Sequence, residues 1–171
     1  MDYFTLRALA HEWDAALAGA TIEDAWTQSP RELSLALARG DDRRTVRVIC
    51  DPALPLLFQT EGVGRQRRNA VDVLDGLAGR VVMGVYAAER DRHVFVRLEG
   101  GDRLQIVLFG SRPNVFWATA AGTVRAAFLD GDDWAGEPAP APRAAPVVDT
   151  AEAFEARWRP RKTLGQTVAG A

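Results

Sequence analysis

Apolar side chains recur near the start of the chain with the three- and four-residue spacing of an amphipathic helix. They form one stripe, made of Leu6, Leu9, Ala10, Trp13 and Leu17. Thr5 is a candidate N-cap, and Gly19 can adopt the left-handed conformation that often follows a last helical turn. The pattern therefore predicts a helix that ends before Gly19.

Beyond this helix the apolar positions alternate, which is typical of half-buried strands. The alternation predicts three strands, over residues 21–28, 33–37 and 44–50. Pro52 and Pro55 then end the pattern, because proline cannot donate a hydrogen bond to a strand ladder. The first third of the chain is thus expected to hold a helix followed by a small antiparallel sheet.

A second helical stripe follows a glycine- and arginine-rich loop at residues 62–68. It predicts a helix over residues 70–78 that stops at Gly79. Five further strands are predicted, over residues 81–88, 94–98, 104–109, 115–119 and 124–128. Their spacing of about ten residues indicates an antiparallel meander.

These elements predict an α+β fold, a mostly antiparallel two-sheet β-sandwich with two helices, over residues 1–130. Residues 131–148 are rich in Pro and Ala and are expected to be a linker. Residues 149–171 are expected to form a basic tail that begins a following region. We expect a chain cut from a longer protein, with a shortened natural protein as the alternative.

The charge of the chain limits what it can bind. The formal net charge is −2 over 171 residues, so any nucleic-acid binding requires a local basic patch. Arg65, Arg67 and Arg68 form the densest basic run of the folded part and can follow a phosphate backbone. A charge run on a loop is, however, more often solvated than functional.

The chain has few of the residues that carry metal or redox chemistry. Cys50 is the single cysteine, and His11 and His93 are the only histidines. No disulfide framework or Cys/His metal cluster can be built from them, so no metal or cofactor is expected. The sequence shows no secretory signal and no apolar run long enough for a membrane span, which favours a cytoplasmic protein without a membrane partner.

Several motifs resemble those of one family in their order and spacing. The opening residues Met1 to Leu9 resemble its acidic residue followed by a Thr-Leu helix. Residues 77–81 resemble the end of its second helix, and residues 110–115 its glycine-to-asparagine turn. The most specific piece is Asp91 and Arg92, an Asp-Arg pair between two strands. The chain thus resembles a divergent N-terminal domain of the NFACT family, also called the fibronectin-binding protein A family.

The resemblance implies a fold like the N-terminal domain of formamidopyrimidine DNA glycosylases. Those enzymes use an amino-terminal proline as nucleophile, followed by a catalytic glutamate. Here Asp2 and Tyr3 stand at these positions, so the imine-forming amine is missing and no enzymatic activity is expected.

The resemblance also implies a role on the ribosome. Full-length family members bind large ribosomal subunits that carry a stalled nascent chain, and they recruit tRNA. This implies RNA recognition by Asp91 and Arg92, in which Asp91 would hold the Arg92 guanidinium, with Asp2 as a weaker candidate. Arg112, in the glycine-to-asparagine turn, is a further candidate.

Two other hypotheses about the function stay open. The older family name suggests an adhesin that binds fibronectin, which the absent signal sequence disfavours. The domain could also be structural and position other parts of a longer protein, as Asp75 suggests by standing where the family has a cation. A turn aspartate such as Asp91 can equally well satisfy backbone amides beside a solvated arginine.

Overall fold

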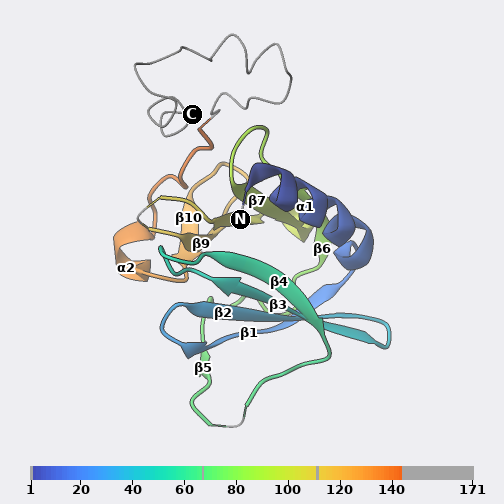
Figure 1. Ribbon diagram of the computed structural model, residues 1–171. Helices are drawn as coiled ribbons and strands as arrows, with labels where there is room; N and C mark the ends of the chain where they lie inside the picture. Colours follow the sequence, from blue (N-terminus) through green and yellow to red (C-terminus); the bar gives the residue numbers. More distant parts are fainter. Residues whose placement is uncertain (1, 67, 111, 144–171) are drawn as a thin grey trace, which may run out of the picture.

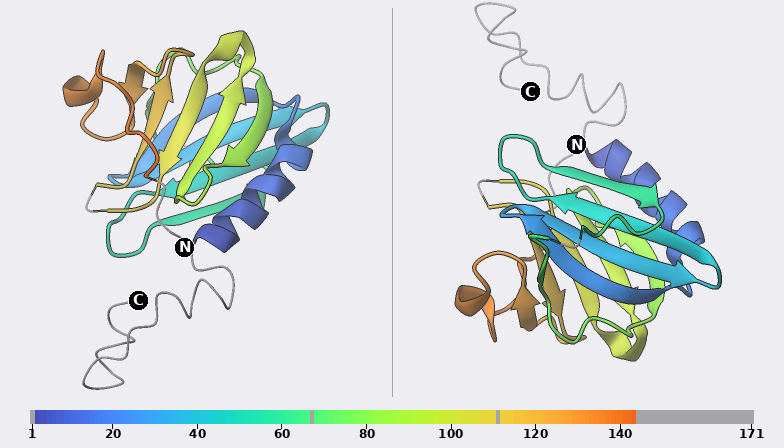
Figure 2. Two further views of the ribbon diagram at one scale, coloured as in Figure 1. Left: turned by 90° about the horizontal axis from the view of Figure 1, so that it is seen from above. Right: turned by 90° about the horizontal axis from the view of Figure 1, so that it is seen from below.

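The computed structural model describes residues 2–66, 68–110 and 112–143. Two five-stranded antiparallel sheets face each other, and a long helix runs along one side of them (Figures 1 and 2). The predicted α+β class, with two antiparallel sheets and two helices, is confirmed, although the second helix lies elsewhere in the chain.

The first sheet has the strand order β4-β3-β2-β1-β5. Its strands are β1 (Thr21–Ser29), β2 (Glu32–Arg39), β3 (Asp42–Ile49), β4 (Leu56–Glu61) and β5 (Val71–Asp72). The first three match the predicted strands. The prediction missed β4, which begins directly after Pro55 and pairs with β3 in antiparallel register.

The second sheet is a meander with the order β10-β9-β8-β7-β6. Its strands are β6 (Val82–Ala87), β7 (His93–Leu98), β8 (Arg103–Val107), β9 (Asn114–Ala118) and β10 (Val124–Ala127). All five were predicted, because each carries alternating apolar residues between turn residues. The 3-10 turn η1 (Glu99–Gly101) and its C-cap Asp102 separate β7 from β8.

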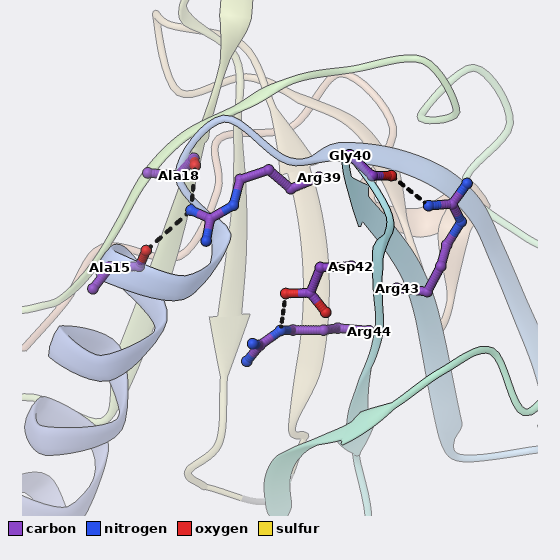
Figure 3. A network of polar contacts seen from close by, with 7 residues as sticks. All are labelled: Ala15, Ala18, Arg39, Gly40, Asp42, Arg43 and Arg44. Carbon is purple, nitrogen blue, oxygen red and sulfur yellow. Dashed lines mark hydrogen bonds and ion pairs between the residues drawn. The ribbon is translucent and has the colours of Figure 1, made fainter.

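Helix α1 (Tyr3–Leu17) buries the predicted stripe at Leu6, Ala10, Trp13 and Leu17. Its N-cap is Asp2 rather than Thr5, because the Asp2 carboxylate accepts a hydrogen bond from the Thr5 backbone N–H at 2.9 Å. At the other end, Arg39 of β2 donates to the carbonyls of Ala15 and Ala18 (Figure 3). These bonds anchor the last turn of α1 to the first sheet.

The core lies between the two sheets and under α1. Trp13 of α1 and Leu104 of β8 are fully buried in it. Trp26 of β1 is also fully buried but lies outside this core cluster, with the Arg65 guanidinium over its ring. Cys50 is also buried, and burial raises the pKa of its thiol to about 12. Residues of both sheets belong to this one cluster, so the sandwich folds around a shared core.

The predicted helix over residues 70–78 is wrong. The segment holds β5 and turns, and Leu74 has a positive φ of 57° that no α-helix allows. Leu74 and Leu77 are buried in the core, and the Leu77 N–H donates to the Leu74 carbonyl. The two leucines are three positions apart and both point into the core. A turn thus has the same apolar spacing as one face of a helix, which explains the wrong prediction.

The second helix is the single turn α2 (Gly131–Trp134), after β10. The Trp134 ring packs edge-on against Phe116, 4.8 Å between centroids, on the outer face of the second sheet. We call residues 135–143 the strap. The Val124 N–H donates to Glu137 and the Ala139 N–H donates to Gly122, so the described part of the predicted linker lies against the sheet. Residues 144–148 and the predicted tail lie outside the described residues.

Candidate nucleic-acid interface at the β6–β7 turn

Asp91 lies in the turn formed by residues 88–92, the β6–β7 turn, and is only 7% exposed. Its carboxylate accepts hydrogen bonds from the backbone N–H of Arg92, at 2.7 Å, and from that of Arg143 in the strap. The expectation that Asp91 holds the Arg92 guanidinium is therefore wrong. Asp91 satisfies backbone donors, as turn aspartates commonly do.

The Arg92 side chain is exposed, and its guanidinium lies over the ring of Phe109, 5.6 Å from the centroid. The Arg92 carbonyl also accepts a hydrogen bond from Leu108 at 3.3 Å. Phe109 follows β8, so these contacts join the β6–β7 turn to the next loop of the sheet. Arg92 thus presents its cation to solvent on an aromatic support.

His93 is completely buried behind this turn. Its ring stacks on Phe109 at 5.2 Å, and its Nδ1 lies 3.4 Å from the Gln105 amide. Burial lowers the pKa of His93 below its ordinary value, and the Asp91 carboxylate, 3.9 Å from Nε2, partly offsets this. His93 therefore supports Phe109 as a neutral ring and has no access to a ligand.

A cavity of about 510 Å³ opens where the strap passes Phe109. Its lining consists of Phe109, Gly110, Pro140, Ala141, Pro142 and Arg143. The Pro140 carbonyl accepts a hydrogen bond from the Gln105 amide, and the Arg143 backbone N–H donates to the Asp91 carboxylate. These two bonds fix the strap at both ends of the cavity. Aromatic, apolar and cationic groups converge at this place.

The other predicted residues lie apart from this turn. Asp2 caps α1, and the hydrogen bonds from Thr5 hold the pKa of its carboxyl below the usual value. Arg65 forms ion pairs with Asp24 at 2.5 Å and Asp72 at 2.6 Å, which raise its pKa. Both side chains thus have structural partners.

Arg68 is exposed in the loop between β4 and β5, and Arg67 lies outside the described residues. Arg112 lines a different cavity, of about 380 Å³, together with Arg31, Asp130 and Trp134. The structure therefore does not bring Arg65, Arg68 or Arg112 together with Arg92 into one site.

Most arginines on the strands pair with carboxylates, including Arg125 of β10, which pairs with Asp102 at 2.8 Å. On the first sheet, Arg43, Arg44 and Arg47 pair with carboxylates at 3.2, 2.8 and 2.6 Å. On the second sheet, within the described residues, Arg97 and Arg103 have no such ion pair and lie over aromatic rings. Sequence reasoning missed these two, although both follow the outward alternation of β7 and β8.

The fold and this turn define a two-sheet α+β module with an arginine–aromatic surface. No protein-family model and no curated protein matches the sequence. Solved structures do match, and one of them is the N-terminal domain of fibronectin-binding protein PavA from Streptococcus pneumoniae. Its TM-score is 0.67 at 14% identity, over 88% of this chain and 66% of that one.

Two further matches have a TM-score of 0.62. The fibrinogen-binding protein of Staphylococcus aureus is 9% identical, over 84% of this chain and 56% of that one. The N-terminal part of the fibronectin/fibrinogen-binding protein FBPS of Streptococcus suis is 12% identical, over 85% of this chain and 61% of that one. The chain has the fold of these domains and spans 56–66% of the length of the three structures.

The described residues contain neither a membrane-spanning helix nor a metal-binding cluster. None of their helices is long and apolar enough to cross a membrane. Among the same residues, no three His, Cys, Asp or Glu side chains are grouped so that they could hold a metal ion.

Proposed function

We propose that this chain is a non-catalytic RNA-binding domain whose ligand is tRNA. In this proposal it belongs to a cytoplasmic, ribosome-associated factor that acts on large subunits carrying stalled nascent chains. The observation that carries the proposal is the Arg92 guanidinium, which is exposed and lies 5.6 Å from the Phe109 ring beside the strap cavity.

The chemistry of this turn suits a nucleic acid. Arginine can bind a phosphate with two hydrogen bonds, or stack on a base through its planar guanidinium. Among the described residues, no carboxylate pairs with Arg92. The carboxylate next to it in the chain, Asp91, is buried and accepts from two backbone N–H groups instead of from the guanidinium.

The fold supports the same proposal indirectly. It matches the N-terminal domain of a fibronectin-binding protein, and the family that the sequence resembles is also called the fibronectin-binding protein A family. The Asp-Arg pair falls in a turn between two strands, as the resemblance implies. The chain spans only part of the length of these structures, so the proposal for the ribosome concerns the contacts of this domain alone.

A second candidate is an adhesin. The printed names of the matching structures describe binding to fibronectin or fibrinogen, and this fold is theirs. Dose-dependent, saturable binding of the chain to immobilised fibronectin, unaffected by Arg92→Ala, would favour this candidate over RNA binding.

The test of the RNA proposal is fluorescence anisotropy of labelled tRNA at about 50 mM and about 200 mM salt. Arg92→Ala should weaken binding about tenfold. It should also lower the slope of log affinity against log salt concentration by about 1, the contribution of one phosphate contact. Arg43→Ala is the matched control, because it removes an equal charge that pairs with Glu23 on the first sheet.

The outcomes separate the alternatives. No binding by the parent chain at low salt would overturn the proposal and favour a structural domain. Binding that Arg92→Ala and Arg43→Ala weaken equally would remove the β6–β7 turn as the contact surface.

A further inference from the structure

A groove of about 600 Å³ separates the exposed side of α1 from β6, the edge strand of the second sheet. Phe4 and Arg7 line it from α1, and Tyr86 and Ala87 line it from β6. Phe4 is 53% exposed and Tyr86 is 43% exposed. Two aromatic rings thus stay open to solvent in one groove, where a purely structural role would favour their burial.

Tyr86 belongs to a stacked array on the outer face of the sheet. Its ring stacks on Phe95 with 5.0 Å between centroids and an angle of 18°. The Arg97 guanidinium lies 6.0 Å from the Tyr86 ring, and the Arg103 guanidinium lies 5.6 Å from the Phe95 ring. Tyr86 pairs with Phe95 and Arg97 pairs with Arg103 in the strand register, so all four side chains occupy neighbouring positions.

This combination of groups fits an unpaired nucleotide. Bases stack on aromatic side chains exposed on a sheet, and arginines beside them bind the phosphates. The groove also holds one carboxylate, Asp14, whose Oδ1 accepts a hydrogen bond from the Val85 backbone N–H at 2.7 Å. That bond keeps the Asp14 oxygen on the protein backbone. Arg7 lines the groove as a cation, and Arg97, which is not among the lining residues, reaches the same place beside Gly84.

The groove is continuous with the β6–β7 turn. Ala87 lines the groove, and Ala88 begins the turn that leads to Arg92. In Figures 1 and 2 the N-terminal end of α1 lies beside this turn. An RNA strand that contacts Arg92 can therefore reach the groove without leaving the protein surface.

We propose that the groove between α1 and β6 binds an unpaired nucleotide of the RNA. Its base stacks on Tyr86 beside Phe4, and its phosphate is held by Arg7 and Arg97. This inference rests on the proposed RNA-binding function and extends it from one contact to a preference for single-stranded segments over duplex.

The experiment uses a short single-stranded RNA that carries 2-aminopurine, whose fluorescence falls when the base stacks. The same label in a blunt duplex RNA is the comparison. The parent chain should bind the single strand and quench its label, and should leave the duplex label unchanged. Tyr86→Leu should weaken binding about tenfold and abolish quenching, because a stacked base contributes that much to affinity.

Three variants sharpen the result. Tyr86→Phe keeps the ring and should quench like the parent. Arg97→Gln should weaken binding, but the RNA that does bind should still have its label quenched, because the Tyr86 ring is unchanged. Met83→Ala is the matched control, since Met83 is 55% exposed on the same strand but does not line the groove. Circular dichroism confirms that each variant is folded.

The outcomes distinguish this inference from the proposed function. If Tyr86→Leu binds and quenches like the parent while Arg92→Ala weakens tRNA binding, the groove proposal is overturned and RNA binding at the turn stands. If the parent binds neither tRNA nor the single strand at low salt, both proposals fail. Loss of binding in Tyr86→Leu and Arg97→Gln, but not in Met83→Ala, supports the groove.

Discussion

The carboxylate of Asp91 accepts a hydrogen bond from the backbone N–H of Arg143, 52 positions later in the chain. This contact ties the strap to the β6–β7 turn. It also separates the roles of two adjacent residues, because Asp91 holds the backbone while Arg92 faces solvent over Phe109. A substitution of Asp91 would therefore affect ligand binding through the position of the strap and the turn.

Asp91→Ala should lower the free energy of unfolding by about 1–3 kcal/mol, because two backbone N–H groups lose their acceptor. Urea denaturation measures the change, and hydrogen exchange at the Arg143 amide should quicken at the same time. Glu89→Ala, an exposed position in the same turn, is the control. Equal stability of the two variants would show that the Asp91 hydrogen bonds contribute nothing.

His93 should make the stability of the protein depend on pH. Burial lowers the pKa of His93 in the folded state below its ordinary value of 6.5. As the pH falls below about 6.5, the unfolded chain therefore binds a proton that the folded chain does not, and the free energy of unfolding falls. The loss can reach about 1.4 kcal/mol for each pH unit between the two pKa values.

Urea denaturation at about pH 7.5 and about pH 5.5 tests this effect of His93. His93→Leu should lose less stability than the parent between the two pH values. His11→Gln, which removes an exposed histidine of α1, is the matched control. The same pH dependence in His93→Leu and the parent would assign the effect to other groups.

Much of the fold follows from periodicity. Strands that place every second residue in the shared core, such as β7 with Val94, Val96 and Leu98, have a pattern that few other structures produce. The same reasoning failed at Leu74 and Leu77, because a turn that points two leucines into the core has the spacing of a helix. The strand β4 was missed because its alternation is short and follows two prolines.

The candidate site was predictable only in part. The sequence placed Asp91 and Arg92 in a turn, but their partners Phe109 and Arg143 come from distant positions that periodicity cannot bring together. Arg65 illustrates the reverse case. It belongs to the densest basic run, yet it pairs with Asp24, 41 positions earlier, and is engaged within the fold. Charge counted along a chain does not show which charges are compensated in space.

Cys50 should react with iodoacetamide only after unfolding. Burial raises the pKa of its thiol to about 12, so almost no reactive thiolate forms near pH 8 in the folded protein. Because Cys50 is the only cysteine, mass spectrometry of the intact chain reports its labelling directly. Labelling as fast in buffer as in denaturant would contradict the buried position.

The contact between Asp14 and β6 should be measurable as an interaction energy. Asp14 Oδ1 accepts from the Val85 N–H, and a Cβ atom added at Gly84 would lie 2.9 Å from that oxygen. Asp14→Ala should cost about 1 kcal/mol of stability, because the N–H of an edge strand loses its acceptor beside an open groove. Gly84→Ala should disturb the same contact by crowding it, and should also crowd Arg97 Nη2 at 2.8 Å and strain a backbone with a φ of 157°.

A double-mutant cycle in urea denaturation separates these effects. If both substitutions act on one contact, the double variant should lose about 0.5–1 kcal/mol less stability than the two single variants lose together. Glu12→Ala, an exposed position of α1, should combine additively with Gly84→Ala. Additive losses for Asp14 and Gly84 would mean that the Asp14 carboxylate does not couple the helix to the edge strand.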